Sequence, residues 1–263
     1  MLSERLHTNN HDPHIRHICW ISICLVYIRI GGIFHACAVL VIFGELLESM
    51  ATCYGGNVSA DGNFGDLNVS SCCSYLPLKT IVTCNGESVE IQLTSFDGPD
   101  EFEQGFKLMN DVIVEGKSWP FNGPYETIEE YRAYFHSHAS FAVTFCDKTR
   151  HGTDVLGCFY IKPNYPGRCS HICNGGFITN PIYRGIGVGS FMGESFKTLA
   201  KDLGYRAALF NLVFASNSAS VNLWKRLGFT QLAVIPGAAV LNGSDGFVDA
   251  LQMFYDFSSV DKA

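Results

Sequence analysis

Residues 184–189 read Arg-Gly-Ile-Gly-Val-Gly, and they stand between a predicted strand and a predicted helix. The strand is the short apolar run 173–178, and the helix spans 191–203 and is stopped by Gly204. Glycines let a backbone approach an anion without a clash at Cβ, and a helix start offers free N–H groups to it. The stretch therefore predicts a phosphate-binding loop, although a plain strand-to-helix turn would use similar glycines.

Two common phosphate loops do not fit this stretch. No Gly-Lys-Ser/Thr follows it, so it is not a Walker loop. The third glycine of the dinucleotide fingerprint is replaced by Met192, and the loop lies late in the chain. If the stretch binds phosphate, it therefore belongs to a different class of phosphate loop from these two.

Apolar periodicity predicts the elements around this loop. It predicts helices at 100–115, 127–135, 191–203 and 218–227. It predicts strands at 89–96, 141–146, 155–161, 173–178, 207–214, 230–235 and 248–255. The order predicts an α/β (α+β) fold in which a mixed, twisted sheet of six to seven strands carries helices on both faces.

Composition limits the partners of the chain. Its 263 residues are 47% hydrophobic and 16% charged, with a net charge of −7, which argues against DNA or RNA as a partner. The 11 cysteines are scattered rather than regularly spaced, and no secretory pattern is convincing. We therefore expect reduced thiols in a cytoplasmic protein.

The N-terminal part differs in character. Residues 18–43 are strongly apolar but are interrupted by Arg29 and His35, and 55–74 reads as a linker. The apolar segment is a marginal membrane anchor, an additional buried helix or a stretch wrongly included in the gene model. We expect an N-terminal extension over 1–74 and one domain over 75–263 with its core at 89–257. Any membrane association would run through 18–43.

Two motifs resemble those of the GNAT superfamily of acetyltransferases. Arg184-x-x-Gly187-x-Gly189 has the spacing of its acetyl-CoA pyrophosphate loop, and Asn217–Phe229 looks like the helix that follows its fifth strand. The resemblance implies a GNAT fold whose fourth and fifth strands splay apart to admit pantetheine. It implies acetyl-CoA as co-substrate, bound by Phe177, Ile178, Thr179, Arg184, Gly185, Ile186, Gly187, Val188, Gly189, Ser190, Asn217 and Ser220.

A closer resemblance is carried by the stretches 156–177, 209–214, 236–243 and 248–250, and by Gly116-Lys-Ser-Trp-Pro120. Over about 75–257 the sequence is similar to the fungal L-azetidine-2-carboxylic acid N-acetyltransferases. The resemblance implies a cytoplasmic homodimer that acetylates proline-like amino acids and lowers oxidative stress. The acceptors implied are azetidine-2-carboxylate, cis-4-hydroxyproline and the glutamate semialdehyde/pyrroline-5-carboxylate pair. By position in the motifs, Asn174 would read the acceptor's carboxylate, while Asn211 and Leu212 would line the acceptor site, with Asn211 also the candidate catalytic group.

The proton transfers are not assigned by the sequence. A proline-like ammonium must lose a proton before it attacks the thioester, and the backbone near Phe177–Thr179 would hold the oxyanion. His171 could serve as the base, but a lone histidine beside a strand is more often structural. The tyrosine acid of many GNAT enzymes is replaced by Trp224, whose indole N–H is not an acid at ordinary pH.

A catalytic cysteine and a metal site both fit the sequence less well than direct transfer from acetyl-CoA does. Cys169, His171 and Cys173 have ligand spacing, but no second pair of ligands is near, so we expect no metal. Two further functions stay open: a GNAT enzyme acting on another small amine or a polyamine, and a non-catalytic acyl-CoA-binding module.

Overall fold

The computed structural model describes residues 22–30, 33–41 and 73–258. The chain divides into two compact units, residues 1–56 and 57–263, and each is described by itself. In the first unit, β1 (Ser22–Ile30) pairs antiparallel with β2 (Ile33–Val41). The buried helix considered for this apolar segment is therefore wrong, since its described residues form strands. No helix of the described residues is long and apolar enough to cross a membrane.

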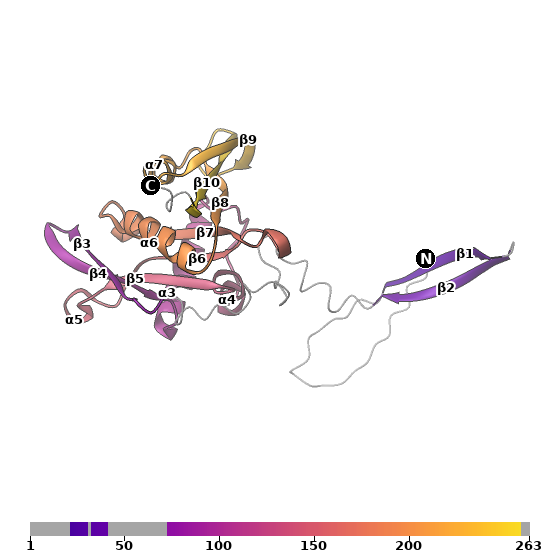
Figure 1. The fold of residues 1–263 in the computed structure, drawn as a ribbon, viewed down its shortest axis with the longest axis horizontal. Coiled ribbons are helices and arrows are strands. Elements are labelled where there is room, and N and C mark those ends of the chain that lie inside the picture. The colour runs from indigo at the N-terminus through magenta and orange to yellow at the C-terminus, as the bar shows by residue number, and fades with distance from the viewer. Residues whose placement is uncertain (1–21, 31–32, 42–72, 259–263) are drawn as a thin grey trace. The chain divides into compact units, whose positions relative to one another are not determined.

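The second unit is built on one sheet of eight strands (Figure 1). Their order across the sheet is β3-β4-β5-β6-β7-β8-β10-β9, and all neighbours are antiparallel except β7 and β8. The strands are β3 (Leu78–Cys84), β4 (Glu87–Ser95), β5 (Ala139–Phe145), β6 (Val155–Pro163), β7 (Ile172–Thr179), β8 (Ala207–Phe214), β9 (Thr230–Val240) and β10 (Phe247–Asp256). The mixed sheet and α/β class predicted from the sequence are thus confirmed.

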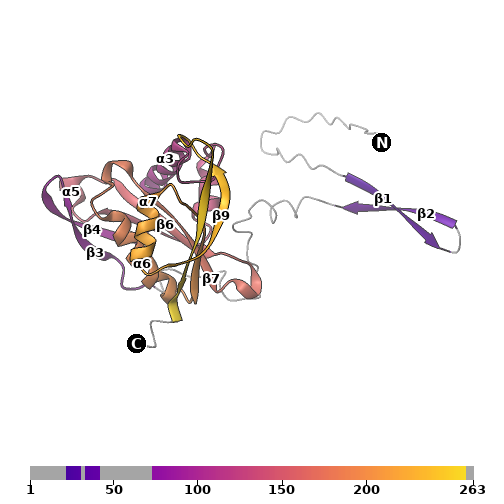
Figure 2. The same ribbon diagram turned by 90° about the horizontal axis from the view of Figure 1, so that it is seen from above.

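The strand count is one higher than the upper predicted number, because β3 was missed. This strand pairs with β4 at the edge of the sheet, and of its residues only Val82 is buried. A strand at the edge of a sheet has a neighbour on one side only, and little of β3 packs into the core; Ile81 is 69% exposed. The strand therefore has few apolar residues in alternation to reveal it in the sequence. At the opposite edge, Figure 2 shows β9 curving beside the rest of the sheet.

Helices cover both faces of the sheet, as predicted. The helices are α3 (Pro99–Glu115), α4 (Ile128–Phe135), α5 (Lys148–His151), α6 (Val188–Asp202) and α7 (Ser218–Arg226), with 3-10 turns at Gly167–Cys169 and Pro181–Tyr183. One core cluster joins α3 and α4 to residues such as Cys158 and Tyr160 of β6. Another joins α6 and α7 to the alternate residues Phe159 and Ile161 of the same strand. Because successive side chains of a strand point to opposite faces, β6 is buried on both sides.

Local sequence signals set the ends of these helices. Thr127 caps α4 through its hydroxyl, which accepts a bond from Glu130 N at 3.2 Å, as the capping motif predicts. Helix α6 begins at Val188 rather than at 191, so the glycine-rich stretch runs directly into its first turn.

Candidate active site

The centre of the sheet opens as a wedge between β7 and β8. In the described part of the chain, these parallel strands pair only at Ile172–Ala207 and Cys173–Ala208. Beyond that point β7 stays with β6, and β8 stays with β10. The splay expected from the resemblance is therefore present. The facing backbone edges lie free of each other, which is the geometry needed to hydrogen-bond an extended ligand carrying amides.

The glycine-rich loop lies at the start of α6. Gly185 and Gly187 have φ of +82° and +107°, which side-chain-bearing residues rarely adopt. Gly187 is the N-cap of α6 and has no side chain to occupy the first N–H groups of the helix. Those N–H groups and the positive end of the helix dipole suit a phosphate.

A cavity of about 790 Å³ connects this loop with the wedge. Ten of the residues that the sequence predicted to bind the cofactor line it: Phe177, Ile178, Thr179, Arg184, Gly185, Gly187, Gly189, Ser190, Asn217 and Ser220. Its volume is within the range of a cofactor-sized pocket. Two further predicted residues, Ile186 and Val188, are not among the lining residues, because their side chains pack into the core.

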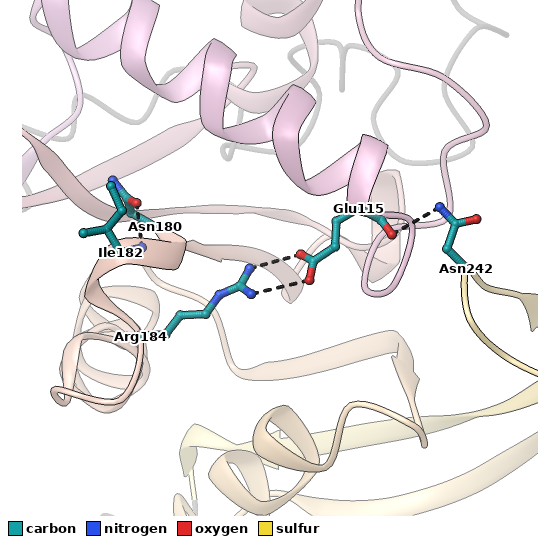
Figure 3. Close-up of polar contacts among 5 residues, drawn as sticks. All are labelled: Glu115, Asn180, Ile182, Arg184 and Asn242. Atoms are coloured by element: carbon teal, nitrogen blue, oxygen red, sulfur yellow. Dashed lines mark hydrogen bonds and ion pairs between the residues drawn. The ribbon is translucent and has the colours of Figure 1, made fainter.

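Arg184 is held from the opposite side of the cavity. Its guanidinium contacts the Glu115 carboxylate through Nη2–Oε2 at 3.2 Å and Nη1–Oε1 at 3.5 Å (Figure 3). Glu115 ends α3, where a negative charge meets the unfavourable end of the helix dipole. Sequence reasoning missed Glu115, along with the further lining residues Val112, Lys117, Ser118, Met192, Ser216, Ala219, Leu223, Arg226, Leu241, Asn242, Gly243 and Ser244.

The α7 end of the cavity contains Asn217, Ser220 and Trp224. Asn217 caps α7, its Oδ1 accepting from Ser220 N at 3.1 Å, so its Nδ2 group remains for a ligand. Trp224 donates its indole N–H to Ser220 Oγ at 3.0 Å and is 3% exposed. It packs against Phe177 and Phe210, each with a ring-centroid distance of 4.7 Å. Trp224 therefore forms part of a rigid cavity wall.

A second cavity of about 430 Å³ lies beside the first, and Leu241 and Asn242 line both. Its walls include Trp119 and Phe121 from the segment after α3, with Leu212 and Phe214 from β8. Leu212, predicted to line the acceptor site, thus lies here rather than in the 790 Å³ cavity. The arrangement provides two compartments that meet at one wall.

The two asparagines predicted to read the acceptor are engaged in separate contacts. Asn174 is 8% exposed, and its Oδ1 accepts from Gly175 N at 2.8 Å, which leaves its NH2 group for another acceptor. The side-chain amides of Asn211 and Asn164 form two hydrogen bonds with each other. Asn211 donates at 2.6 Å and Asn164 donates in return at 3.1 Å. Each amide of that pair still keeps one N–H. Asn164 was not identified from the sequence.

His171, the base considered from the sequence, lies in the turn before β7. Its carbonyl accepts from Arg206 N at 2.9 Å, which ties the turn to the start of β8. It is not among the lining residues of either cavity. No group of three or more His, Cys, Asp or Glu side chains in the described residues is placed to hold a metal ion.

Comparison with known proteins agrees with this geometry. Residues 110–229 match the acetyltransferase (GNAT) family. Over 111 residues the chain is 49% identical to N-acetyltransferase aca1 of Schizosaccharomyces pombe; this match covers 42% of the chain and only 53% of aca1.

Solved structures share the fold. A GCN5-related N-acetyltransferase from Kribbella flavida superposes with a TM-score of 0.57 at 24% identity, covering 63% of this chain and 97% of that one. The acetyltransferase yncA of Salmonella typhimurium, solved with acetyl-CoA, gives 0.56 at 14% identity, covering 64% and 94%. Residues 110–229 of the chain are therefore similar to the GNAT acetyltransferase family, and the solved structures share the fold of this part.

Proposed function

We propose that the protein transfers the acetyl group of acetyl-CoA to the amine of a small proline-like amino acid. The observation that carries this proposal is the 790 Å³ cavity, which runs from the glycine loop at the start of α6 to the open end of the β7–β8 wedge, where Phe177–Thr179 of β7 and Ser216 after β8 line it. The diphosphate of acetyl-CoA would lie at the N–H groups of α6, and the pantetheine arm would pair with the strand edges. The name of aca1 supports N-acetyl transfer as the reaction.

The acceptor class is supported by the second cavity and, separately, by Asn174 of β7 and Asn211 of β8, which line neither cavity but lie on the two strands of the wedge. An amide NH2 group donates to a carboxylate without burying another charge, and Asn174 and Asn211 each keep such a donor. The apolar walls at Trp119, Phe121 and Leu212 suit a small ring. Azetidine-2-carboxylate and cis-4-hydroxyproline have both features.

The reaction needs a neutral amine, an oxyanion site and a proton for the leaving thiolate. The N–H groups near Phe177–Thr179 are the candidate oxyanion donors, since these residues line the cofactor cavity where β7 has left β8. Trp224 cannot act as the acid, because an indole N–H does not ionise at ordinary pH and this one is bonded to Ser220. We propose that water protonates the thiolate.

Thiol release from acetyl-CoA tests the proposal with azetidine-2-carboxylate, L-proline, spermidine and no acceptor. We expect release with azetidine-2-carboxylate. Release only with spermidine would replace the amino acid by a polyamine. Tight binding of acetyl-CoA without release in any arm would indicate an acyl-CoA-binding module instead.

We further propose a cytoplasmic homodimer. None of the six cysteines of residues 73–258 forms a disulfide, as expected in a reducing compartment. The edge strand β9 and the following strand expose the apolar residues Leu232, Val234, Val240 and Phe247, between 45% and 77%. An exposed apolar edge of this kind favours association with a second copy. Sedimentation of the wild type and of Leu232→Lys tests this, with a shift toward monomer expected in the variant.

A further inference from the structure

Lys162 of β6 is a buried amine that the reaction as described so far does not use. It is 1% exposed, and its Nζ lies 3.7 Å from the ring centre of Tyr134 and 4.2 Å from that of Tyr160. One N–H contacts the carbonyl of Tyr134 at 3.4 Å. No carboxylate of residues 73–258 lies within 4.0 Å of it. The amine has therefore lost its water without gaining a counter-ion.

Burial changes the protonation of this group. It lowers the pKa of Lys162 from 10.5 to about 7, because a charged amine is poorly stabilised away from water. The titratable groups that face it are His138 and the phenols of Tyr134 and Tyr160. Burial, and then the charge of Lys162, lower the pKa of His138 to about 4. A neutral amine is thus available near neutral pH.

Lys162 lines neither cavity, and its position relates it instead to Asn174, the proposed donor to the acceptor's carboxylate. It lies directly opposite Asn174 in the β6–β7 register, so both side chains leave the same face of the sheet. Asn174 follows Cys173, the last residue of β7 that pairs with β8. Lys162 therefore lies level with the point where β7 and β8 begin to separate.

Trp119 lies between the aromatic rings around Lys162 and the 430 Å³ cavity, the proposed acceptor site. Its ring lies over Gly176, where a Cβ would come within 2.6 Å of it. Its ring centre is 6.3 Å from that of Tyr134 and 6.5 Å from that of Tyr160, the two rings that flank the amine. The same side chain lines the 430 Å³ cavity with Leu212. Trp119 therefore borders both the amine's aromatic cluster and the space for the acceptor.

We propose that Lys162 is the general base that takes a proton from the ammonium of the acceptor, directly or through one water, at the Trp119 side of its cluster. This inference rests on the proposed function. The N–H bond of the ammonium breaks and an N–H bond forms on Lys162. The freed amine then attacks the thioester carbonyl, the C–S bond breaks, and the nitrogen loses its second proton. One proton ends on the thiol of coenzyme A and one is released to solvent.

The carboxylate of the acceptor has a part in this step. Once protonated, Lys162 needs a counter-ion, and an amino acid brings one whereas a simple amine does not. An adjacent anion raises the basicity of the lysine, so arrival of the carboxylate favours proton transfer from the neighbouring ammonium. This coupling selects amino acids over amines of the same ring size.

Steady-state kinetics of Lys162→Met and Lys162→Arg test the assignment, with Lys107→Met on the exposed face of α3 as the matched control. Lys162→Met removes the base, and Lys162→Arg keeps a permanent cation that cannot accept a proton. We expect both to lower kcat for azetidine-2-carboxylate by about 10²–10⁴-fold. The loss should be smaller for 4,4-difluoro-L-proline, whose fluorines make the amine less basic. Unchanged acetyl-CoA binding by calorimetry would show that each variant is folded.

The wild-type pH profile provides a test without a variant. At saturating substrates, kcat should fall on the acid side with a pKa above the value of about 7 in the free protein, because the bound carboxylate raises the pKa of Lys162, but still below that of the acceptor's amine. Full activity of Lys162→Arg would show that only the charge matters and would overturn the role as base. Wild-type activity with unaffected variants would overturn this inference alone. A wild type that binds acetyl-CoA but acetylates no acceptor would overturn the proposed function with it.

Discussion

Glu115 and Arg184 form a two-point ion pair across the cofactor cavity, although 69 residues separate them in the chain. Both side chains are partly exposed, 31% and 46%, so water screens the attraction. A diphosphate entering the cavity would compete with Glu115 for the guanidinium. We therefore expect the carboxylate to oppose binding of the diphosphate while it positions Arg184.

Glu115→Gln should consequently strengthen acetyl-CoA binding. The change removes a negative charge from the lining and frees Arg184 for the ligand. We expect a decrease in Kd of up to about fivefold, because an exposed pair contributes roughly 0–1 kcal/mol. Calorimetry measures this, with Glu194→Gln, whose partner is Lys197 on the same helix, as the control. Weaker binding by Glu115→Gln would mean that orientation of Arg184 outweighs the repulsion.

Gly187→Ala should impair cofactor binding more than stability. The φ of +107° strains any side chain, at a cost of about 1–2 kcal/mol. The added methyl would also stand at the N-cap, where the phosphate is expected. Gly86→Ala is the matched control, since its φ is +83° and its Cβ would meet open space. Chemical denaturation should show similar losses for the two variants, and only Gly187→Ala should raise the KM for acetyl-CoA. Equal KM values would remove the loop from phosphate binding.

Asn174→Ala should raise the KM for the acceptor much more than the KM for acetyl-CoA. Its NH2 group is the proposed donor to the carboxylate, while its oxygen only bonds the next backbone N–H. A loss of about tenfold or more is expected, because a hydrogen bond to a charged group contributes about 1.5–3 kcal/mol. Equal effects on both substrates would contradict the carboxylate role.

Asn164→Ala should reproduce part of the effect of Asn211→Ala. The two amides hold each other by paired hydrogen bonds, so the loss of Asn164 leaves Asn211 unoriented. We expect both single variants to lower kcat/KM for the acceptor, and the double variant to lose less than the sum of the two in free energy. Additive losses would show that the two residues act independently.

Acid should destabilise the domain in the window between pH 6.5 and 4. Burial lowers the pKa of His136 to about 4, with a further contribution from the charge of Arg132. The unfolded chain binds this proton first as pH falls, so the free energy of unfolding decreases through the window. Denaturation curves at pH 7 and 5 check this. His136→Asn, which can still bond Ser140, should reduce the pH dependence. If the free energy of unfolding of His136→Asn changed with pH as steeply as that of the wild type, His136 would not be the group responsible.

The sequence predicted what depends on local pattern. The strand, glycine loop and helix around residues 184–189 follow from periodicity and glycine chemistry, and the cap at Thr127 follows from a short motif. The partners of Arg184 and Asn211 could not be predicted, because Glu115 and Asn164 lie 69 and 47 residues away. Likewise, a lysine between apolar residues of β6 gives no sign in sequence that its amine is enclosed by aromatic rings.

Asn242 lies on the wall common to the two cavities, and its side chain donates to the carbonyl of Glu115 (Figure 3). The same amide also donates to the carbonyl of Val114. A single short turn after β9 thus secures the end of α3 for both compartments. Phe121 and Ala238 line only the 430 Å³ cavity. Substitutions there would reshape the proposed acceptor site and leave the proposed acetyl-CoA site unchanged. If the two cavities hold donor and acceptor as proposed, the two specificities can change independently during divergence or engineering as long as the wall around Asn242 is kept.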